Sequence, residues 1–287
     1  MYDSHFIKAN GIQLHYVKHG EGEPLILLHG FPDFWYSWRN QIPELAKHYK
    51  VFALDLRGYN KSEVPSKIKD YKIDILANDI KEFINALGYE KATIVAHDWG
   101  AAIAWYLSAY YPDVVNQLII LNMPVTHELK KQVLTNKKQR KRSWYMYFFQ
   151  IPFLPELLFR MNPRKFFKRV FENLCYNKQT ISEQEIDEYV KAFQYPQNYK
   201  AALNYYRALF KYFLYEKTDN VPLIKNNVLL IYGENDPAFR KELIGNTHQY
   251  CEKAPLIKYV PQCGHFVQHE KPELVNQYIL EFLKDKK

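Results

Sequence analysis

The stretch from Thr93 to Ala102 places a carboxylate in a setting suited to a catalytic nucleophile. Branched apolar residues typical of a buried strand run directly into small residues typical of a closely packed helix. The sharp turn of a nucleophile elbow needs small residues two positions before and after the nucleophile, and Ala96 and Gly100 supply them around Asp98. A helix N-cap aspartate would not require them. We therefore predict that Asp98 attacks an electrophilic carbon and forms an alkyl ester with the enzyme.

Two later segments offer the groups that hydrolysis of such an ester needs, a base and a residue that orients it. Asp236 lies in a turn after the apolar run 228–232, and His265 follows the apolar run 257–260. Nucleophile, acid and histidine in this order form one of the recurring catalytic triads. Among ten histidines, we predict that His265 is the base, that Asp236 orients it, and that His97 packs or hydrogen-bonds internally.

A turn at His29-Gly30-Phe31-Pro32 follows another apolar run, 25–28. We predict that the backbone N–H groups of Phe31 and Trp99 converge on the oxygen that becomes negative when water attacks the ester, which would make them an oxyanion hole. The Phe31-Pro32 bond is a candidate cis peptide.

The elements that must position these residues follow from the pattern of apolar runs. Asn10-Gly11 predicts an opening hairpin. Short branched runs then alternate with helical spacing, as in 73–87, which predicts a mostly parallel sheet with helices on both faces. Between 126 and 219 no strand pattern appears, and the sequence is helical, aromatic and basic. We therefore predict an α/β protein with a first core part at 1–125, a helical cap at 126–219 and a second core part at 220–287.

Composition limits the class of protein. The N-terminus has no apolar leader run, and no apolar run is long enough to span a bilayer, so we expect a soluble protein without membrane insertion. The 3 cysteines form neither a metal-type pair nor a disulfide framework. We therefore expect a cytoplasmic protein with no metal and no cofactor, as a monomer or a homodimer.

Net charge is +8, and much of it lies in a basic run at 137–142. Such a run can be a solvated helix face, or a patch for nucleic acid or an anionic membrane. No nucleic-acid-binding module accompanies it, so we favour the solvated face.

The residues now assembled resemble the epoxide hydrolases of the α/β-hydrolase superfamily over essentially the whole chain. The matching segments are 29–32, 35–38, 55–62, 97–100, Asp236 and 264–265, and, more specifically, 144–152 and 204–207. Three positions depart from the common pattern: Asn60 and Ala96 replace glycines, and Phe266 replaces a frequent Trp. None of these changes removes a catalytic group, and Asn60 can keep the left-handed turn.

The resemblance implies an α/β-hydrolase fold and a mechanism. Tyr145 and Tyr206 would donate hydrogen bonds to the epoxide oxygen while Asp98 attacks a ring carbon, and water activated by His265 would then release a vicinal diol. The protein's partners would then be a small apolar epoxide, as substrate, and water. Tyr147 and Tyr205 are close competitors for the two tyrosine roles. For the apolar substrate-binding wall we propose Trp35, Phe148, Phe149, Phe153 and Phe266.

Two other functions remain open. A haloalkane or haloacetate dehalogenase uses the same nucleophile and base, but Phe31 stands where many haloalkane enzymes have a halide-binding Asn, and Trp99 stands where haloacetate enzymes have an Arg. A catalytically silent receptor or carrier would use the pocket only to hold an apolar ligand, and the intact triad argues against it. A serine esterase is excluded because Asp98 occupies the serine position.

Overall fold

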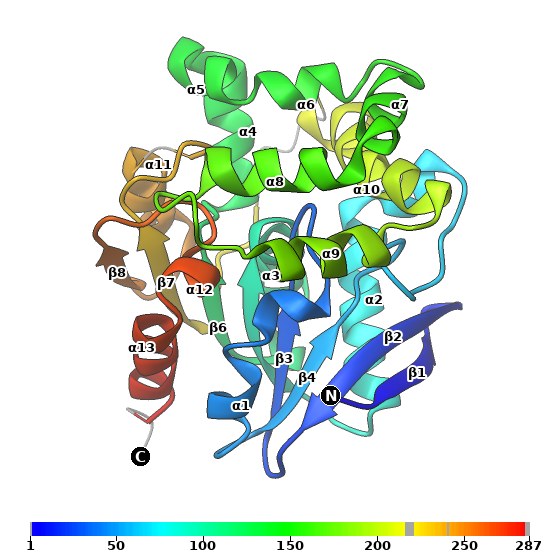
Figure 1. Cartoon of the computed structure of the whole chain (residues 1–287). Helices are drawn as coiled ribbons and strands as arrows, with labels where there is room; N and C mark the ends of the chain where they lie inside the picture. Colours follow the sequence, from blue (N-terminus) through cyan, green and yellow to red (C-terminus); the bar gives the residue numbers. More distant parts are fainter. Residues whose placement is uncertain (1, 216–220, 240, 285–287) are drawn as a thin grey trace.

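The computed structural model describes residues 2–215, 221–239 and 241–284 and contains one eight-stranded sheet in the order β1-β2-β4-β3-β5-β6-β7-β8 (Figure 1). The strands β1 and β2 pair antiparallel with each other, β2 pairs antiparallel with β4, and all other pairs are parallel. The strands are β1 (Ser4–Ala9), β2 (Ile12–His19), β3 (Pro24–Leu28), β4 (Lys50–Leu54), β5 (Ala92–His97), β6 (Val115–Leu121), β7 (Asn227–Gly233) and β8 (Leu256–Val260).

Alternate residues of the central strands enter two separate hydrophobic cores, one on each face of the sheet. In β3, Ile26 and Leu28 pack into the core beneath α2 (Ile73–Ala86) and α3 (Asp98–Tyr110). Leu25 and Leu27 pack into the core beneath α1 (Ile42–Leu45) and α13 (Pro272–Lys284). All four side chains are completely buried. The continuous apolar runs seen in the sequence therefore belong to strands buried on both faces.

The turns expected from asparagine and glycine are present. Asn10 (φ 48°) and Gly11 (φ 79°) connect β1 to β2. Asn60 adopts φ 44° and donates a hydrogen bond to Asp55 at 2.7 Å, so it keeps the turn that glycine would make. The peptide bond between Phe31 and Pro32 is cis.

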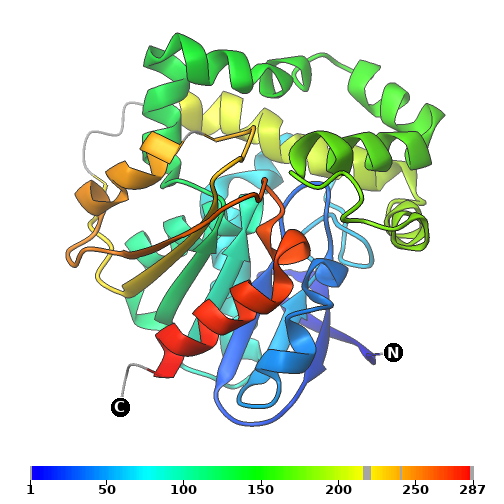
Figure 2. The same ribbon diagram turned by 60° about the vertical axis from the view of Figure 1, so that its left-hand side comes forward.

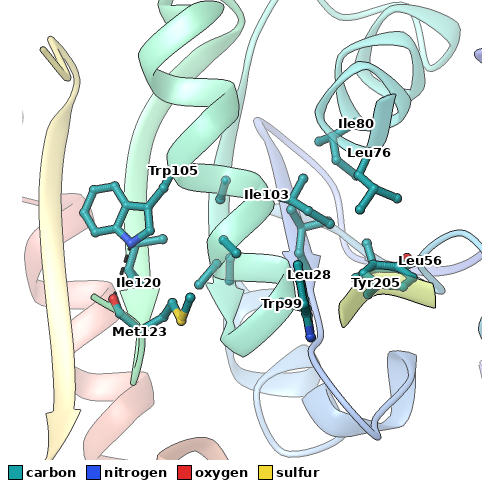
Figure 3. Close-up of a cluster of buried hydrophobic side chains, with 14 of the residues drawn as sticks. Leu28, Leu56, Leu76, Ile80, Trp99, Ile103, Trp105, Ile120, Met123 and Tyr205 are labelled. Carbon is teal, nitrogen blue, oxygen red and sulfur yellow. Dashed lines mark hydrogen bonds between the residues drawn. The ribbon is translucent and has the colours of Figure 1, made fainter. Parts of the chain in front are cut away.

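The helix α3, which begins at Asp98, is anchored on the sheet by large rings (Figure 3). The Trp105 indole N–H donates to the Met123 carbonyl at 3.3 Å, and Ile103 lies beside Leu28 of β3. Trp99 packs edge-on against Tyr205, so the first turn of α3 also contacts the helices above the sheet. The helix α3, whose first residue is Asp98, is therefore held by packing against the sheet on one side and against the helices above the sheet on the other.

Between β6 and β7 the described residues form helices and, at Ile224, an isolated bridge to Cys251. Figures 1 and 2 show these helices as a layer above one end of the sheet. We call this layer the cap. Its first helix begins at Thr126. The predicted end at 219 lies outside the described residues, and the division into domains stays a prediction. Its elements are α4 (Thr126–Thr135), α5 (Lys137–Arg142), α6 (Trp144–Phe148), α7 (Leu154–Met161), α8 (Pro163–Leu174), α9 (Glu183–Ala192), α10 (Pro196–Ala208) and the π-helix η4 (Leu209–Leu214).

Short helices lie in the remaining connections: η1 (Trp35–Trp38), η2 (Ile68–Tyr71), η3 (Pro112–Val114), α11 (Lys241–Gly245), η5 (Asn246–Tyr250) and α12 (Val267–Glu270). Within the described part of the chain, no helix is both long enough and apolar enough to cross a membrane.

Candidate active site

The turn from β5 into α3 has the strained geometry of a nucleophile elbow. Asp98 has a backbone φ of 48°. Residues other than glycine rarely adopt this left-handed conformation, which costs on the order of 1–3 kcal/mol. A Cβ atom at Gly100 would overlap the carbonyl oxygens of Leu28 and His29, and a Cβ atom at Gly30 would overlap the Asp98 side chain. The two glycines therefore let the end of β3 approach the elbow closely.

The Asp98 carboxylate is polarised from the side of this loop. The backbone N–H of Phe31 donates to Asp98 Oδ1 at 2.8 Å. No second bond from the Trp99 backbone N–H to this carboxylate is formed among the residues that the structure describes, although Trp99 is the next residue of α3. One of the two predicted oxyanion donors thus already points at Asp98, and the role of the pair stays a prediction.

The loops after β7 and β8 bring the two other triad candidates to the same end of the sheet. His265 Nε2 lies 3.6 Å from Asp98 Oδ2, and His265 Nδ1 lies 2.9 Å from Asp236 Oδ2. All three side chains are buried. The histidine stands between the two carboxylates, as a base next to a nucleophile and held by an orienting acid would.

The charges of the two aspartates control the protonation of His265. Burial lowers its pKa, but the negative charges of Asp236 and Asp98 and the hydrogen bonds to both outweigh burial and raise the pKa to about 10. Burial raises the pKa of Asp98, and the hydrogen bond and charge of His265, with further help from the Phe31 N–H, bring the net pKa below its usual value. In the resting enzyme Asp98 is therefore ionised and His265 is protonated.

His97, next to the nucleophile, has a structural role, as predicted. Its Nε2 bonds to the His265 carbonyl at 2.9 Å, and burial lowers its pKa to about 4. It is therefore a neutral ring that supports the backbone of the candidate base.

Sequence reasoning missed how Asp236 is held. Asn122, the residue after β6, donates to Asp236 Oδ2 at 2.8 Å and to the Gly264 carbonyl at 3.1 Å. The other carboxylate oxygen of Asp236 accepts from the backbone N–H groups of Ala238 and Phe239, at 2.7 and 3.2 Å. The position of Asn122 at the carboxyl end of a strand between β5 and β7 was a signal that could have identified it.

A second missed residue, Glu270, ties the His265 loop to the cap. Its carboxylate accepts from the N–H of Gly264 at 2.7 Å and from the N–H of Tyr176, beyond α8, at 2.8 Å. The His265 N–H in turn donates to the Leu174 carbonyl in α8 at 2.8 Å. The loop that carries the candidate base is therefore clamped between sheet and cap.

Tyr145 of α6 and Tyr206 of α10 line the cavities that also contain Asp98. Their ring centroids lie 5.9 Å apart and the rings are nearly perpendicular. Burial, reinforced by the charge of Asp98, raises the pKa of both phenols, so both hydroxyls stay protonated and able to donate. The two competitors lie elsewhere: Tyr147 is exposed against Phe210, and the Tyr205 hydroxyl donates to the Arg57 carbonyl at 2.7 Å.

A cavity of about 970 Å³ extends from Asp98 and His265 into the cap, and its wall is mainly apolar, with many aromatic side chains. Of the predicted wall residues, Phe148 and Phe149 line it. Apart from the two tyrosines, four aromatic lining residues were not predicted as wall: Phe31, Trp144, Phe159 and Phe166. The cavity can hold a molecule of drug-like size, most of whose surface would meet apolar groups.

The other three predicted wall residues do not line this cavity, and the prediction is wrong for them. Phe153 precedes α7 and is 85% exposed. Trp35 packs against Tyr2 and Phe34, and its backbone N–H donates to Asp55 Oδ1. Phe266 is completely buried behind His265, against Phe171. Aromatic residues next to a motif were assigned to the wall without knowledge of which way each side chain turns.

No group of three or more His, Cys, Asp or Glu side chains in the described part of the chain is arranged to hold a metal ion.

Comparisons with known proteins place the chain in a family. Residues 23–272 match the model of the alpha/beta hydrolase fold family. Human epoxide hydrolase 4 is 36% identical over 285 residues, which cover 97% of this chain and 78% of the relative. The Bacillus subtilis AB hydrolase superfamily protein YfhM is 38% identical, with 98% of this chain and 97% of the relative covered.

Solved structures agree with these relatives. A variant of an epoxide hydrolase from Bacillus megaterium, in complex with a naphthyloxy-propanediol product, superposes with a TM-score of 0.87 at 35% identity and covers 98% of this chain and 100% of the other. The epoxide hydrolase CorEH superposes with a TM-score of 0.89 at 28% identity over 100% of both chains. The chain therefore belongs to the alpha/beta hydrolase fold family and, within it, to the epoxide hydrolases.

Proposed function

We propose that the chain converts an epoxide and water into a vicinal diol through a covalent ester on Asp98. The observation that carries the proposal is the meeting of an ionised carboxylate, a histidine 3.6 Å away and two protonated phenols at one cavity. The ring opening needs a nucleophile and an acid, and the ester hydrolysis needs a base.

In the first step Asp98 attacks a ring carbon, the carbon–oxygen bond of the epoxide breaks, and its electron pair goes to the ring oxygen. Tyr145 and Tyr206 hydrogen-bond to that oxygen and supply a proton as negative charge develops. Their raised pKa values keep the protons on the phenols until the ring opens. Because both phenols share the cavity with Asp98, one oxygen can receive two donors.

The second step follows from the loss of charge on Asp98. Esterification makes this side chain neutral, so one of the two negative charges that raise the pKa of His265 disappears. The imidazolium can then release its proton, which passes through solvent to the phenolate that gave its proton to the ring oxygen and restores that phenol. Neutral His265 takes a proton from water, the resulting hydroxide attacks the ester carbonyl, and Asp236 stabilises the imidazolium that forms.

During that attack the ester carbonyl oxygen becomes negative. The Phe31 N–H, which donates to Asp98 Oδ1 at 2.8 Å in the resting state, is placed to stabilise that oxygen. The Trp99 N–H is the proposed second donor. When the tetrahedral intermediate collapses, its bond to the alkyl oxygen breaks, and the proton of its hydroxyl group passes to the departing alkoxide. This releases the diol and restores the carboxylate, and His265 is again protonated.

A dehalogenase differs in how it stabilises the leaving group, because halide needs N–H donors whereas an epoxide oxygen needs acids. The two phenols favour the epoxide, and the Phe31 side chain offers no N–H to a halide. A silent carrier is disfavoured because a buried, partnered triad costs stability without benefit to simple binding.

The test is product analysis with styrene oxide and a matched alkyl halide, both at concentrations below saturation. We expect diol formation and a clear preference for the epoxide. A faster release of halide would instead assign the chain to the dehalogenases, and no turnover of either compound would favour the carrier.

A further inference from the structure

The outer part of the large cavity is positively charged. Its lining includes five cationic side chains, all of them exposed: Lys138, Lys141 and Arg142 from α5, and Lys165 and Arg169 from α8. Among the described residues that line the cavity, Asp98 is the only acidic one, and it is buried. The nucleophile therefore lies beyond an entrance at which two separate helices gather positive charge.

The four cationic residues of α8 form two pairs, one on the side of the helix that faces α9 and one on the side that lines the cavity. Arg164 and Lys168 form ion pairs with Glu183 and Asp187 of the segment that forms α9. Lys165 and Arg169, one position further along in each case, line the cavity and form no ion pair with any residue that the structure describes. Only the cavity-facing pair is left without an acidic partner.

The cations of α5 divide in a similar way. Arg140 donates to the Val133 and Leu134 carbonyls and does not line the cavity. Arg142 lines it, but its guanidinium donates to the carbonyls of Asp236 and Pro237 and so supports the loop of the triad acid. Lys138 and Lys141 line the cavity, and their ammonium groups have no partner within the described ranges.

Most of the remaining wall of the cavity is apolar. Phe148, Phe149, Phe159 and Phe166 line it, with the rings of Phe159 and Phe166 stacked 4.0 Å apart. A molecule that fills the cavity would therefore meet positive charge at the exposed end, aromatic rings along the wall, and the buried nucleophile with its two phenols.

We infer that the substrate is an amphiphilic epoxide: its ring lies at Asp98, its middle is apolar, and its far end carries an anionic group such as a carboxylate that Lys165, Arg169, Lys138 and Lys141 select. This inference rests on the proposed epoxide hydrolysis. A cleft lined by one sign of charge raises the local concentration of the oppositely charged substrate and its association rate by roughly 10- to 1,000-fold at low salt. The cations would therefore act mainly on kcat/KM and little on kcat.

The test compares terminal epoxides of straight-chain carboxylic acids with the corresponding primary amides, which have the same length and no charge. For the wild-type protein we expect kcat/KM to be about tenfold or more higher for the acid at low salt. The preference should shrink when ionic strength rises from about 0.01 to 0.15 M, because the screening length then falls from about 30 to 8 Å.

The variant K165Q/R169Q should lose most of this preference, because its kcat/KM should fall about tenfold further for the acid than for the amide. The matched control R164Q/K168Q removes two positive charges from the same helix on the side facing α9, and it should retain the preference. The circular dichroism spectrum and the melting temperature of each variant, compared with those of the wild-type protein, report that it is folded.

Three results would overturn the inference. The wild-type protein could hydrolyse acid and amide equally, or the two double variants could lose the preference equally, which would reduce the effect to net charge. Alternatively, K165Q/R169Q could keep its preference while it loses binding to phosphatidylserine vesicles, which would assign the cations to a membrane surface. In each case turnover of the amide leaves the proposed function standing, whereas no turnover of any epoxide refutes both.

Discussion

The hydroxyl groups of Tyr145 and Tyr206 should account for most of the assistance to ring opening. Each phenol lines a cavity that Asp98 also lines, and its pKa is raised by burial and by the charge of Asp98, so each can donate to the epoxide oxygen at neutral pH. In Y145F or Y206F one donor remains, and the loss of one neutral hydrogen bond, about 0.5–1.5 kcal/mol, should slow alkylation up to about tenfold. In the double variant no acid remains, and the loss should be about a hundredfold to ten-thousandfold.

That range corresponds to about 2.7–5.4 kcal/mol at 1.36 kcal/mol for each tenfold change. The assay is single-turnover kinetics with styrene oxide at enzyme concentrations above substrate, because it isolates ester formation from later steps. Hydrolysis of an ester already formed depends on His265, Asp236 and the backbone donors, so its rate should change little.

Two neighbouring tyrosines provide controls, because the same replacement of Tyr by Phe can be made at positions that do not face Asp98. Y147F removes an exposed hydroxyl, and it should leave both rates unchanged. Y205F removes the hydrogen bond to the Arg57 carbonyl, which should lower the free energy of unfolding by about 1 kcal/mol and leave alkylation near normal. Near-normal alkylation in the Y145F/Y206F variant, or equal losses in Y205F and Y206F, would refute the assignment of the two acids.

Three further predictions concern the triad and the elbow. H265Q should form the ester but not hydrolyse it, so the intact mass should increase by one substrate on a peptide that contains Asp98. Stability should depend on pH through His265, because its folded pKa of about 10 lies above the ordinary 6.5. This stabilisation is complete below pH 6.5 and is lost as pH rises toward 10. The free energy of unfolding measured in urea should therefore fall over this interval more for the wild-type protein than for H265Q. G100A should destabilise by about 1–3 kcal/mol and impair activity because its Cβ overlaps two carbonyls, whereas G245A, which has open space, should do neither.

Each of these predictions has an opposing result. Diol production by H265Q with no increase in mass would contradict the role of the base. Parallel pH profiles of wild type and H265Q would mean that the folded protein does not retain the His265 proton. Equal behaviour of G100A and G245A would mean that the elbow has room for a larger residue.

The sequence was sufficient for the sheet and for the elements that carry the triad. Runs such as 25–28 and 118–121 are buried on both faces, and their composition alone indicates that burial. The turn residues at Asn10 and Asn60 take the left-handed conformation that their side chains tolerate. These features are local, so sequence patterns report them directly.

Features that depend on contacts between distant segments were not predictable in the same way. Asn122 and Glu270 act by hydrogen bonds to loops more than a hundred residues away or across the cap boundary. Phe153 and Phe166 look alike in sequence, yet one is exposed before α7 and the other lines the cavity. The direction in which a cap side chain turns depends on helix packing that no local pattern specifies.

The central claim, an ester on Asp98, is tested most directly by one turnover in water enriched in the heavy oxygen isotope, with enzyme in excess over styrene oxide. If water attacks the ester carbonyl, the new oxygen enters the carboxylate, and the diol carries an oxygen that belonged to Asp98. We therefore expect unlabelled diol, and heavy oxygen in the peptide that contains Asp98, by mass spectrometry. Heavy oxygen in the diol of this first turnover, with an unlabelled Asp98 peptide, would mean that water attacks the epoxide directly and would contradict the account.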